Sequence, residues 1–352
     1  MEAATVPATP AVKGDRLRAF IGTYGLIAVL LALPVYFAVY DLVNDGDLSR
    51  IGNNLVDGIS NGAIWALVAI GYTLVYGIVE LINFAHGEVF MIGSFVAASL
   101  FATFGLTEDT SYVLLAIGLL VVLVLCMLAS GVLNTMIERV GYRPLRNAPK
   151  LAPLITAVGF SFILQNVGLL WRGGSPQSVP DLIHSQQTVF TIAGVPILRG
   201  YILAFAVMVP LVFALTWFIG RTRAGRAMRA TAQDPEAARL MGINVNATIS
   251  LTFLLGGMLA GAAGLVYALY QTNVWYFQGF KAGLIAFTAA VMGGIGNVRG
   301  AVLGGLIIGV IQSLADSRLG PQWTEAVVFG YLIAIMVLRP RGLLGEETRE
   351  AG

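Results

Sequence analysis

The stretch 221–245 reads RTRAGRAMRATAQDPEAARLMGINV and separates two long apolar runs with a polar segment that contains its own short helix. Asp234 is a favourable N-cap, Pro235 suits the first helical position, and Glu236 complements the positive end of the helix dipole. Gly242 supplies a left-handed stop. A helix of about two turns is marginal in water by itself. We therefore predict that this helix is ordered by docking against another surface.

Ala237 and Ala238 give this helix a face of small side chains, which would allow a partner to approach closely. The positive-inside rule offers a simpler explanation of the whole segment, because cytoplasmic loops of membrane proteins are enriched in arginine. The segment holds five arginines: Arg221, Arg223, Arg226, Arg229 and Arg239. The capped helix, rather than the charge, is what favours a docking site for a separate protein.

The composition identifies an integral membrane protein. Of the 352 residues, 57% are hydrophobic and only 11% are charged, whereas soluble domains carry roughly 25% charged residues. The length allows about ten membrane helices. The net charge of +2 gives no reason to expect a nucleic-acid partner.

Ten apolar segments follow one another along the chain, and we predict an all-α membrane fold from them. The last hairpin contains two pieces of only a dozen or so residues, although about 20 are needed to span a bilayer. It is therefore either a pair of short crossings or a re-entrant hairpin buried in protein. Residues 41–57 are expected to form an acidic loop. The segments are 20–40, 59–79, 89–104, 112–136, 151–171, 201–219, 248–270, 284–295, 301–314 and 324–338.

The distribution of basic residues predicts the topology. If the N-terminus is cytoplasmic and every segment crosses, all but five of the 21 lysines and arginines lie inside, as the positive-inside rule requires. The five outside are Arg50, Arg172, Arg199, Lys281 and Arg318. We thus expect cytoplasmic tails at 1–19 and 341–352, a transmembrane domain at 20–340, and a large inner loop at 221–247.

A second stretch, GYTLVYGIVELINFAHGEVFMIG at 71–93, places ionisable groups beside apolar spans. Such groups are costly within a membrane and often functional. Asn83 and His86 are three residues apart, so we expect them on one helical face. With Glu88, they either line a translocation path or simply cap helices at a water-exposed inner turn.

These stretches together resemble the permeases of branched-chain amino acid ABC importers, the LivH type. The similarity rests on 71–97, on 221–245, on LLGGMLAGAAGLVYAL at 254–269, on AFTAAVMGGIGNVRGAVLGGLIIGVIQ at 286–312 and on the terminal RPRGLLGE. It covers roughly residues 55–345. Within 221–245, the order Glu236, Ala237, Ala238 and then Gly242 is similar to the EAA loop by which such permeases dock into their ATPases, although the later Ile-x-Leu-Pro part of that motif is missing.

The resemblance implies an ABC importer permease in a bacterial inner membrane. Its implied partners are a second permease subunit, two cytosolic ATPase subunits, an extracytoplasmic binding protein, membrane lipid and an amino acid substrate. Leucine, isoleucine or valine is the implied cargo, with urea, short amides or other amino acids as alternatives. The implied ATPase-coupling residues are Asp234, Pro235, Glu236, Ala237, Ala238 and Gly242, and the substrate-path candidates are Asn83, His86, Glu88 and Asn297.

The chain itself is not expected to be an enzyme. It has no Gly-x-x-x-x-Gly-Lys-Ser/Thr loop for nucleotide phosphates, so ATP would be bound by the partner subunits. With one cysteine and two histidines, we expect neither a metal site nor a cofactor.

An autonomous secondary transporter or channel is the alternative from another functional class. It would need ion-coupling residues at mid-membrane depth. Acidic residues are scarce there, because Glu80 and Glu88 lie at a turn and Asp316 at the end of a span. That alternative also leaves the short helix of 234–242 without a role.

Overall fold

Helices dominate the computed structural model, which describes residues 13–44, 46–146, 148, 149 and 151–345. Ten helices are long: α1 (Lys13–Asn44), α2 (Ser49–Val79), α3 (His86–Thr103), α4 (Tyr112–Ile137), α5 (Leu151–Arg172), α6 (Arg199–Arg221), α9 (Val245–Gln271), α10 (Gln278–Gly293), α11 (Val298–Arg318) and α12 (Pro321–Leu338). The shorter ones are α7 (Arg223–Gln233) and α8 (Pro235–Leu240), with a π-turn at Glu138–Tyr142 and a 3-10 turn at Arg143–Leu145 after α4. Two small antiparallel pairs join β1 (Gln177–Ser178) with β4 (Asn273–Val274), and β2 (Thr188–Ile192) with β3 (Val195–Leu198).

Nine helices in the described part of the chain are long and apolar enough to cross a membrane. The tenth long helix, α10, has 16 residues and is about 24 Å long, short of a hydrocarbon core of about 30 Å. The expectation of two short pieces in the last hairpin is therefore right for α10 and wrong for the piece that follows it. The piece 301–314 is part of α11, which at 21 residues has the length of an ordinary span.

The acidic loop expected at 41–57 is wrong. α1 continues to Asn44 and α2 already begins at Ser49, so Asp41 and Asp57 both lie within helices. Each carboxylate has partners there: Asp57 accepts hydrogen bonds from the hydroxyls of Tyr270 and Ser313. Acidic groups are tolerated inside helical bundles when they are paired in this way.

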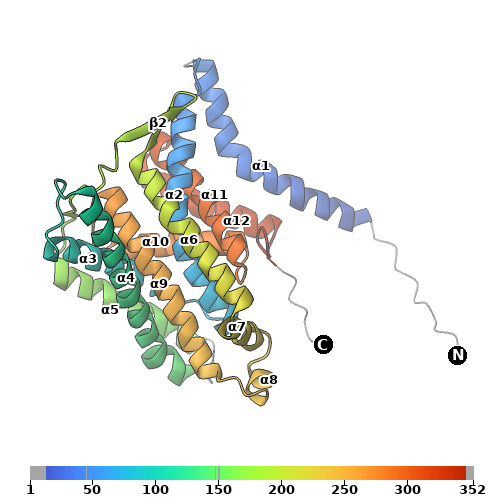
Figure 1. Cartoon of the computed structure of the whole chain (residues 1–352). Helices are drawn as coiled ribbons and strands as arrows, with labels where there is room; N and C mark the ends of the chain where they lie inside the picture. The colour runs from blue at the N-terminus through green and yellow to red at the C-terminus, as the bar shows by residue number, and fades with distance from the viewer. Residues whose placement is uncertain (1–12, 45, 147, 150, 346–352) are drawn as a thin grey trace.

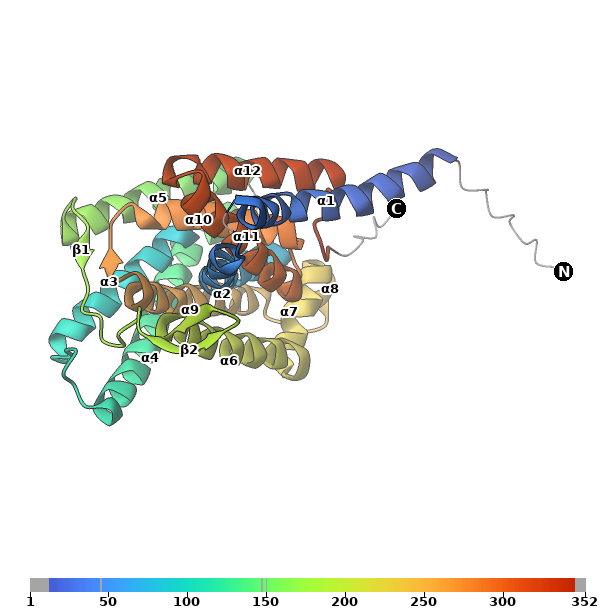
Figure 2. The same ribbon diagram turned by 90° about the horizontal axis from the view of Figure 1, so that it is seen from above.

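Asp41 forms a buried ion pair that joins α1 to α11. Its two carboxylate oxygens accept from the guanidinium of Arg318 in α11 at 2.7 and 2.5 Å. The Phe37 ring lies 5.4 Å from the same guanidinium. This contact anchors the end of α1, whose first turns extend beyond α12 (Figure 2).

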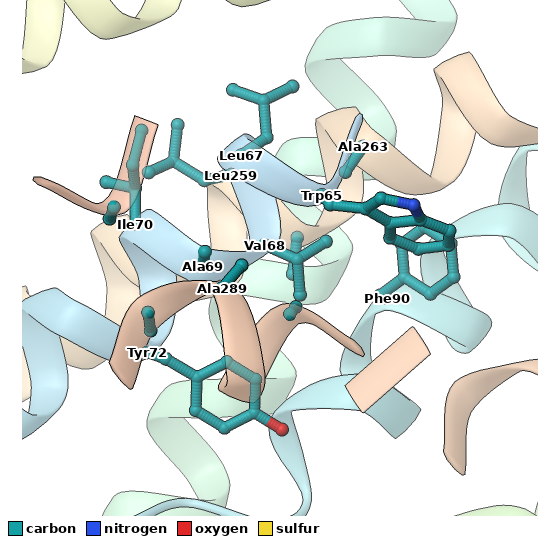
Figure 3. Close-up of a cluster of buried hydrophobic side chains, with 14 of the residues drawn as sticks. Trp65, Leu67, Val68, Ala69, Ile70, Tyr72, Phe90, Leu259, Ala263 and Ala289 are labelled. Carbon is teal, nitrogen blue, oxygen red and sulfur yellow. The ribbon is translucent and has the colours of Figure 1, made fainter. Parts of the chain in front are cut away.

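α2 is the central helix of the bundle. Every residue from 62 to 75 is buried, as expected of a helix that is apolar all round. Figure 3 shows Trp65, Val68 and Tyr72 of α2 among side chains from neighbouring helices, including Phe90 of α3 and Ala289 of α10. α9, α10 and α11 surround it.

Glycines bring α2 and α11 into backbone contact. A Cβ atom at Gly305 would stand 2.5 Å from the Cα of Ala66, and one at Gly62 would stand 2.7 Å from the Cα of Leu306. A Cβ atom at Gly58 would stand 2.5 Å from the Cα of Val310. Helices in lipid gain little from apolar burial against each other, so close packing through small residues is a main source of association. The absence of side chains at these glycines therefore lets the α2 and α11 backbones pack closely, and this close packing stabilises the pair.

The chain re-enters the bundle between α2 and α3. Glu80 takes a left-handed conformation at φ 53° and ends α2. Six residues later, His86 opens α3 directly beside Gly71, which lies eight residues before the end of α2, or about 12 Å along its axis. α3 thus begins inside the bundle, well before the level at which α2 ends.

The two sets of basic residues lie at opposite ends of the bundle. The β2–β3 hairpin occupies one end and α7 and α8 the other (Figure 1). Arg50 and Arg199 begin α2 and α6 at the hairpin end, and Arg318 closes α11 there. The arginines of 221–239 lie at the α8 end, so these eight residues separate to opposite ends of the bundle as the loop count predicts.

Candidate functional site

α8 forms where the sequence predicts it. The Asp234 carboxylate caps the helix, accepting from the backbone N–H groups of Glu236 at 2.8 Å and Ala237 at 2.9 Å. Pro235 occupies the first turn, and Gly242 adopts φ +82° just beyond the end. The local prediction of capped start and left-handed stop is confirmed.

The exposed face of α8 is not the face of small residues, Ala237 and Ala238, that the sequence predicted. Ala238 is only 3% exposed and packs into the main hydrophobic cluster of the chain, so it holds α8 against the bundle and cannot meet a partner. Ala237 remains exposed. The large apolar side chains at the end of this segment are almost fully exposed, Leu240 at 90% and Met241 at 82%. The sequence reasoning missed these two because it took small residues, rather than large ones, as the contact face.

α7 fixes the position of α8. It is N-capped by Thr222, whose hydroxyl accepts from the Gly225 N–H at 3.0 Å. Gly225, Met228 and Thr231 form its buried side. The Arg229 guanidinium donates to the carbonyl of Ile219 at the end of α6. A force applied to α8 would therefore reach α6 through α7.

Asn83 is a buried structural hub. Its Nδ2 donates to the side-chain oxygen of Asn134 at 3.0 Å, while its Oδ1 accepts from the Ala85 N–H and from the Tyr142 hydroxyl, both at 3.2 Å. Asn134 in turn donates to the Phe253 carbonyl at 2.7 Å. The network joins the re-entrant segment to α4 and α9.

The prediction that Asn83 and His86 share a helical face is wrong. Asn83 precedes α3, and its carbonyl accepts from the His86 N–H at 3.0 Å. The chain needs the non-helical residues 80–85 to turn back into the bundle, and this leaves Asn83 outside the helix.

His86 and Glu88 are fully buried in the first turn of α3. The Ser161 hydroxyl donates to Glu88 Oε1 at 3.1 Å. Among the described residues, Glu88 Oε2 and both ring nitrogens of His86 have no hydrogen-bond partner. The His86 ring packs edge-on against Tyr72, with 4.8 Å between ring centroids. These side chains face protein and not an open cavity.

A cavity of about 630 Å³, the α7 pocket, opens at the α8 end of the bundle. Asn297 lines this pocket and also stabilises the local fold. Its Oδ1 caps α11, accepting from the Arg299 and Gly300 N–H groups at 3.0 and 3.2 Å, and its Nδ2 donates to the Leu344 carbonyl at 2.9 Å. The pocket is lined by Tyr76, Gly77, Glu80, Thr216, Ile219, Gly220, Arg229, Ala232, Ile295, Gly296, Asn297, Val298 and Arg299.

A second cavity of about 390 Å³, the β4 pocket, lies nearer the hairpin end. It is lined by Trp65, Pro176, Tyr267, Gln271, Asn273, Trp275, Gln278, Lys281, Ala282, Ile285 and Gln312. Asn83, His86 and Glu88 line neither of these two pockets.

We expect Asn83→Leu to prevent stable folding, because it would leave the Asn134 side-chain oxygen and the Ala85 N–H without a partner in a dry interior. Each such loss costs about 1–3 kcal/mol. Thermal unfolding of the purified chain measures the effect. The matched control is Asn166→Leu, since within the described residues the exposed Asn166 side chain bonds only to the Phe162 carbonyl of its own helix. An Asn83→Leu protein as stable as the control would contradict the structural role.

Comparison with known proteins agrees with the family resemblance seen in the sequence. The family described as "Branched-chain amino acid transport system / permease component" matches residues 54–337. The high-affinity branched-chain amino acid transport system permease protein BraD of Pseudomonas aeruginosa is 42% identical over 302 residues, covering 84% of this chain and 96% of BraD. LivH of Escherichia coli K12, of the same description, is 40% identical over 304 residues, with coverage of 84% and 96%. A probable LivH of Methanocaldococcus jannaschii is 29% identical over 297 residues, with coverage of 81% and 89%.

Proposed function

Because the chain belongs to the family of branched-chain amino acid transport permeases, we propose that it is the membrane subunit of an ATP-driven importer of leucine, isoleucine or valine. It supplies half of a translocation path, and a second permease subunit supplies the other half. Two cytosolic ATPase subunits drive it, and an extracytoplasmic binding protein delivers the substrate.

The observation that carries this proposal is the exposed surface of α8. Leu240 ends α8 and Met241 follows it, and both side chains are almost fully exposed, whereas Ala238 on the other side of α8 is buried in the bundle. Exposed apolar side chains of this size on a polar segment are typical of a protein–protein contact. An ATPase that grips Leu240 and Met241 would move α8 and α7 together, because α8 follows α7 after Asp234 alone.

Transport requires an opening between the two pockets. Trp65 borders the β4 pocket and Tyr76 borders the α7 pocket, and about 16 Å of buried α2 separates them. ATP-driven movement of α7 would have to shift the helices around α2 to connect them. Asn297 remains our path candidate because it lines the α7 pocket. Asn83, His86 and Glu88 would influence the path by holding the start of α3.

We further propose that the α8 end is cytoplasmic in a bacterial inner membrane, with both termini on that side. Arg299 and Ser178 are exposed, and they lie on opposite sides in this arrangement. Single cysteines at these positions, Arg299→Cys and Ser178→Cys, should react with an impermeant maleimide from opposite sides of sealed vesicles. Cys126 is buried and is replaced by alanine for this measurement. Labelling of both cysteines from one side would disprove the arrangement.

The function is tested by co-expressing the chain with candidate partners and reconstituting the complex in liposomes. Radiolabelled L-leucine should accumulate only with ATP and binding protein, and unlabelled isoleucine and valine should compete. Strong competition by urea or short amides, without competition by valine, would replace the substrate assignment. Uptake by the chain alone, driven by an ion gradient, would replace the importer by a secondary transporter.

A further inference from the structure

The β4 pocket holds an unsatisfied donor. Gln278, in the first turn of α10, is 6% exposed. Its Oε1 accepts from the Trp275 N–H at 2.9 Å, but within the described chain its Nε2 has no partner. A buried donor left unpaired carries a desolvation cost, and native structures rarely retain one without a reason. An acceptor brought by a ligand would remove that cost.

A positive charge lies next to this donor. Lys281 follows Gln278 by three residues on α10, so both side chains project from the same face of the helix, and both line the pocket. The Lys281 ammonium lies 3.2 Å from the Glu325 carboxylate, with each side chain about half exposed. An amide donor and an ammonium group on one face suit a carboxylate ligand, and Glu325 provides the opposite charge close by.

Part of the pocket wall is apolar, and its Trp65 side chain is held in place. The Trp65 indole is fixed by its hydrogen bond to the Gln312 side chain at 2.6 Å, and it packs against the Tyr267 ring with 6.2 Å between centroids. Ile285 and Ala282 continue the apolar surface on α10. A volume of about 390 Å³ falls within the roughly 300–1,000 Å³ of small-molecule sites, which combine apolar walls with a few polar groups.

We propose that the β4 pocket is a receiving site for a free α-amino acid with an apolar side chain. The substrate carboxylate accepts from Gln278 Nε2 and Lys281 Nζ, and the side chain packs against Trp65, Tyr267 and Ile285. This assignment rests on the proposed import function and adds the place where substrate first meets this subunit. The α7 pocket is then the exit side.

Gln278→Glu tests the site with little structural change. The carboxylate of the variant still accepts from the Trp275 N–H, but it has no donor and repels a substrate carboxylate. Gln322→Glu is the matched control: it introduces the same charge at the exposed start of α12, outside the pocket.

The measurement is a titration of intrinsic fluorescence in the full-length chain in detergent, because Trp65 and Trp275 both line the pocket. L-Leucine should produce a saturable change in the wild type and in Gln322→Glu. In Gln278→Glu the apparent affinity should fall at least tenfold, and L-leucinamide, which lacks the carboxylate, should bind the wild type at least tenfold more weakly than leucine. A flat wild-type titration, or equal affinities for both ligands or for both variants, would overturn the site.

Uptake by the reconstituted wild-type complex is measured separately. Failure of the site shows as normal leucine import together with a Gln278→Glu variant that binds and imports as well as Gln322→Glu. Failure of the import function shows as an absence of wild-type uptake while the fluorescence titration still saturates, and that result supports the binding site.

Discussion

Leu240→Asp combined with Met241→Asp is expected to abolish co-purification of the ATPase subunits and to reduce uptake at least about 100-fold. Both side chains are exposed in the isolated chain, at 90% and 82%, so the change should not disturb its fold. In a complex, the new carboxylates would be buried without partners, at a cost of several kcal/mol, and about 2.7 kcal/mol already corresponds to 100-fold in affinity.

The control for this result is Val189→Asp, which makes the same kind of change at a half-exposed position on β2, at the opposite end of the bundle. Co-purification with the ATPase should be unchanged in that variant. Ala238→Glu should behave differently from both, because its side chain would have to enter the core and would destabilise the chain before any partner binds. Normal ATPase binding by the Leu240/Met241 double variant would show that α8 is not the contact.

Gly305→Val is expected to prevent formation of the bundle. A Cβ at this position meets the Ala66 backbone at 2.5 Å from Cα and 2.6 Å from N, and a backbone cannot move aside as a flexible side chain can. Overpacking a core costs about 1–3 kcal/mol when side chains can adjust. We expect a larger loss here, above about 3 kcal/mol, because the central α2–α11 contact has to separate.

Membrane abundance and the Tm of the purified chain measure this effect. Gly330→Val is the matched control, since nothing lies within 4 Å of a Cβ at Gly330 on α12, and that variant should express and melt like the wild type. If Gly305→Val matches it, the close approach of α2 and α11 is not what stabilises the fold.

Most helices could be predicted from hydropathy, because charged residues interrupt the apolar runs. The segments expected at 112–136 and 151–171 correspond to α4 at Tyr112–Ile137 and α5 at Leu151–Arg172. The rule failed where an acidic side chain is paired inside the bundle. Asp41 and Asp57 suggested a loop, and only their partners in α9 and α11, distant in sequence, explain why helices continue through them.

The candidate site was predicted less completely than the fold. Local capping rules predicted the start and the end of α8 correctly, because Asp234, Pro235 and Gly242 determine the conformation of residues adjacent to them in the sequence. Which face of α8 is buried depends on how α7 sits against α6 and α9, and local sequence contains no such information. Asn83 shows the same limit: its partners, Asn134 and Tyr142, are more than 50 residues away.

The ion pair between Asp41 and Arg318 has a consequence for the order of assembly. α1 is synthesised first, yet its buried partner is 277 residues further along the chain. During synthesis, α1 therefore enters the membrane before its partner exists. Asp41, near the end of α1, stays close to the water boundary until α11 has been inserted. Contacts between residues far apart in the sequence form late. Closure of this contact would be a late step in biogenesis, reached only by chains synthesised at least as far as Arg318.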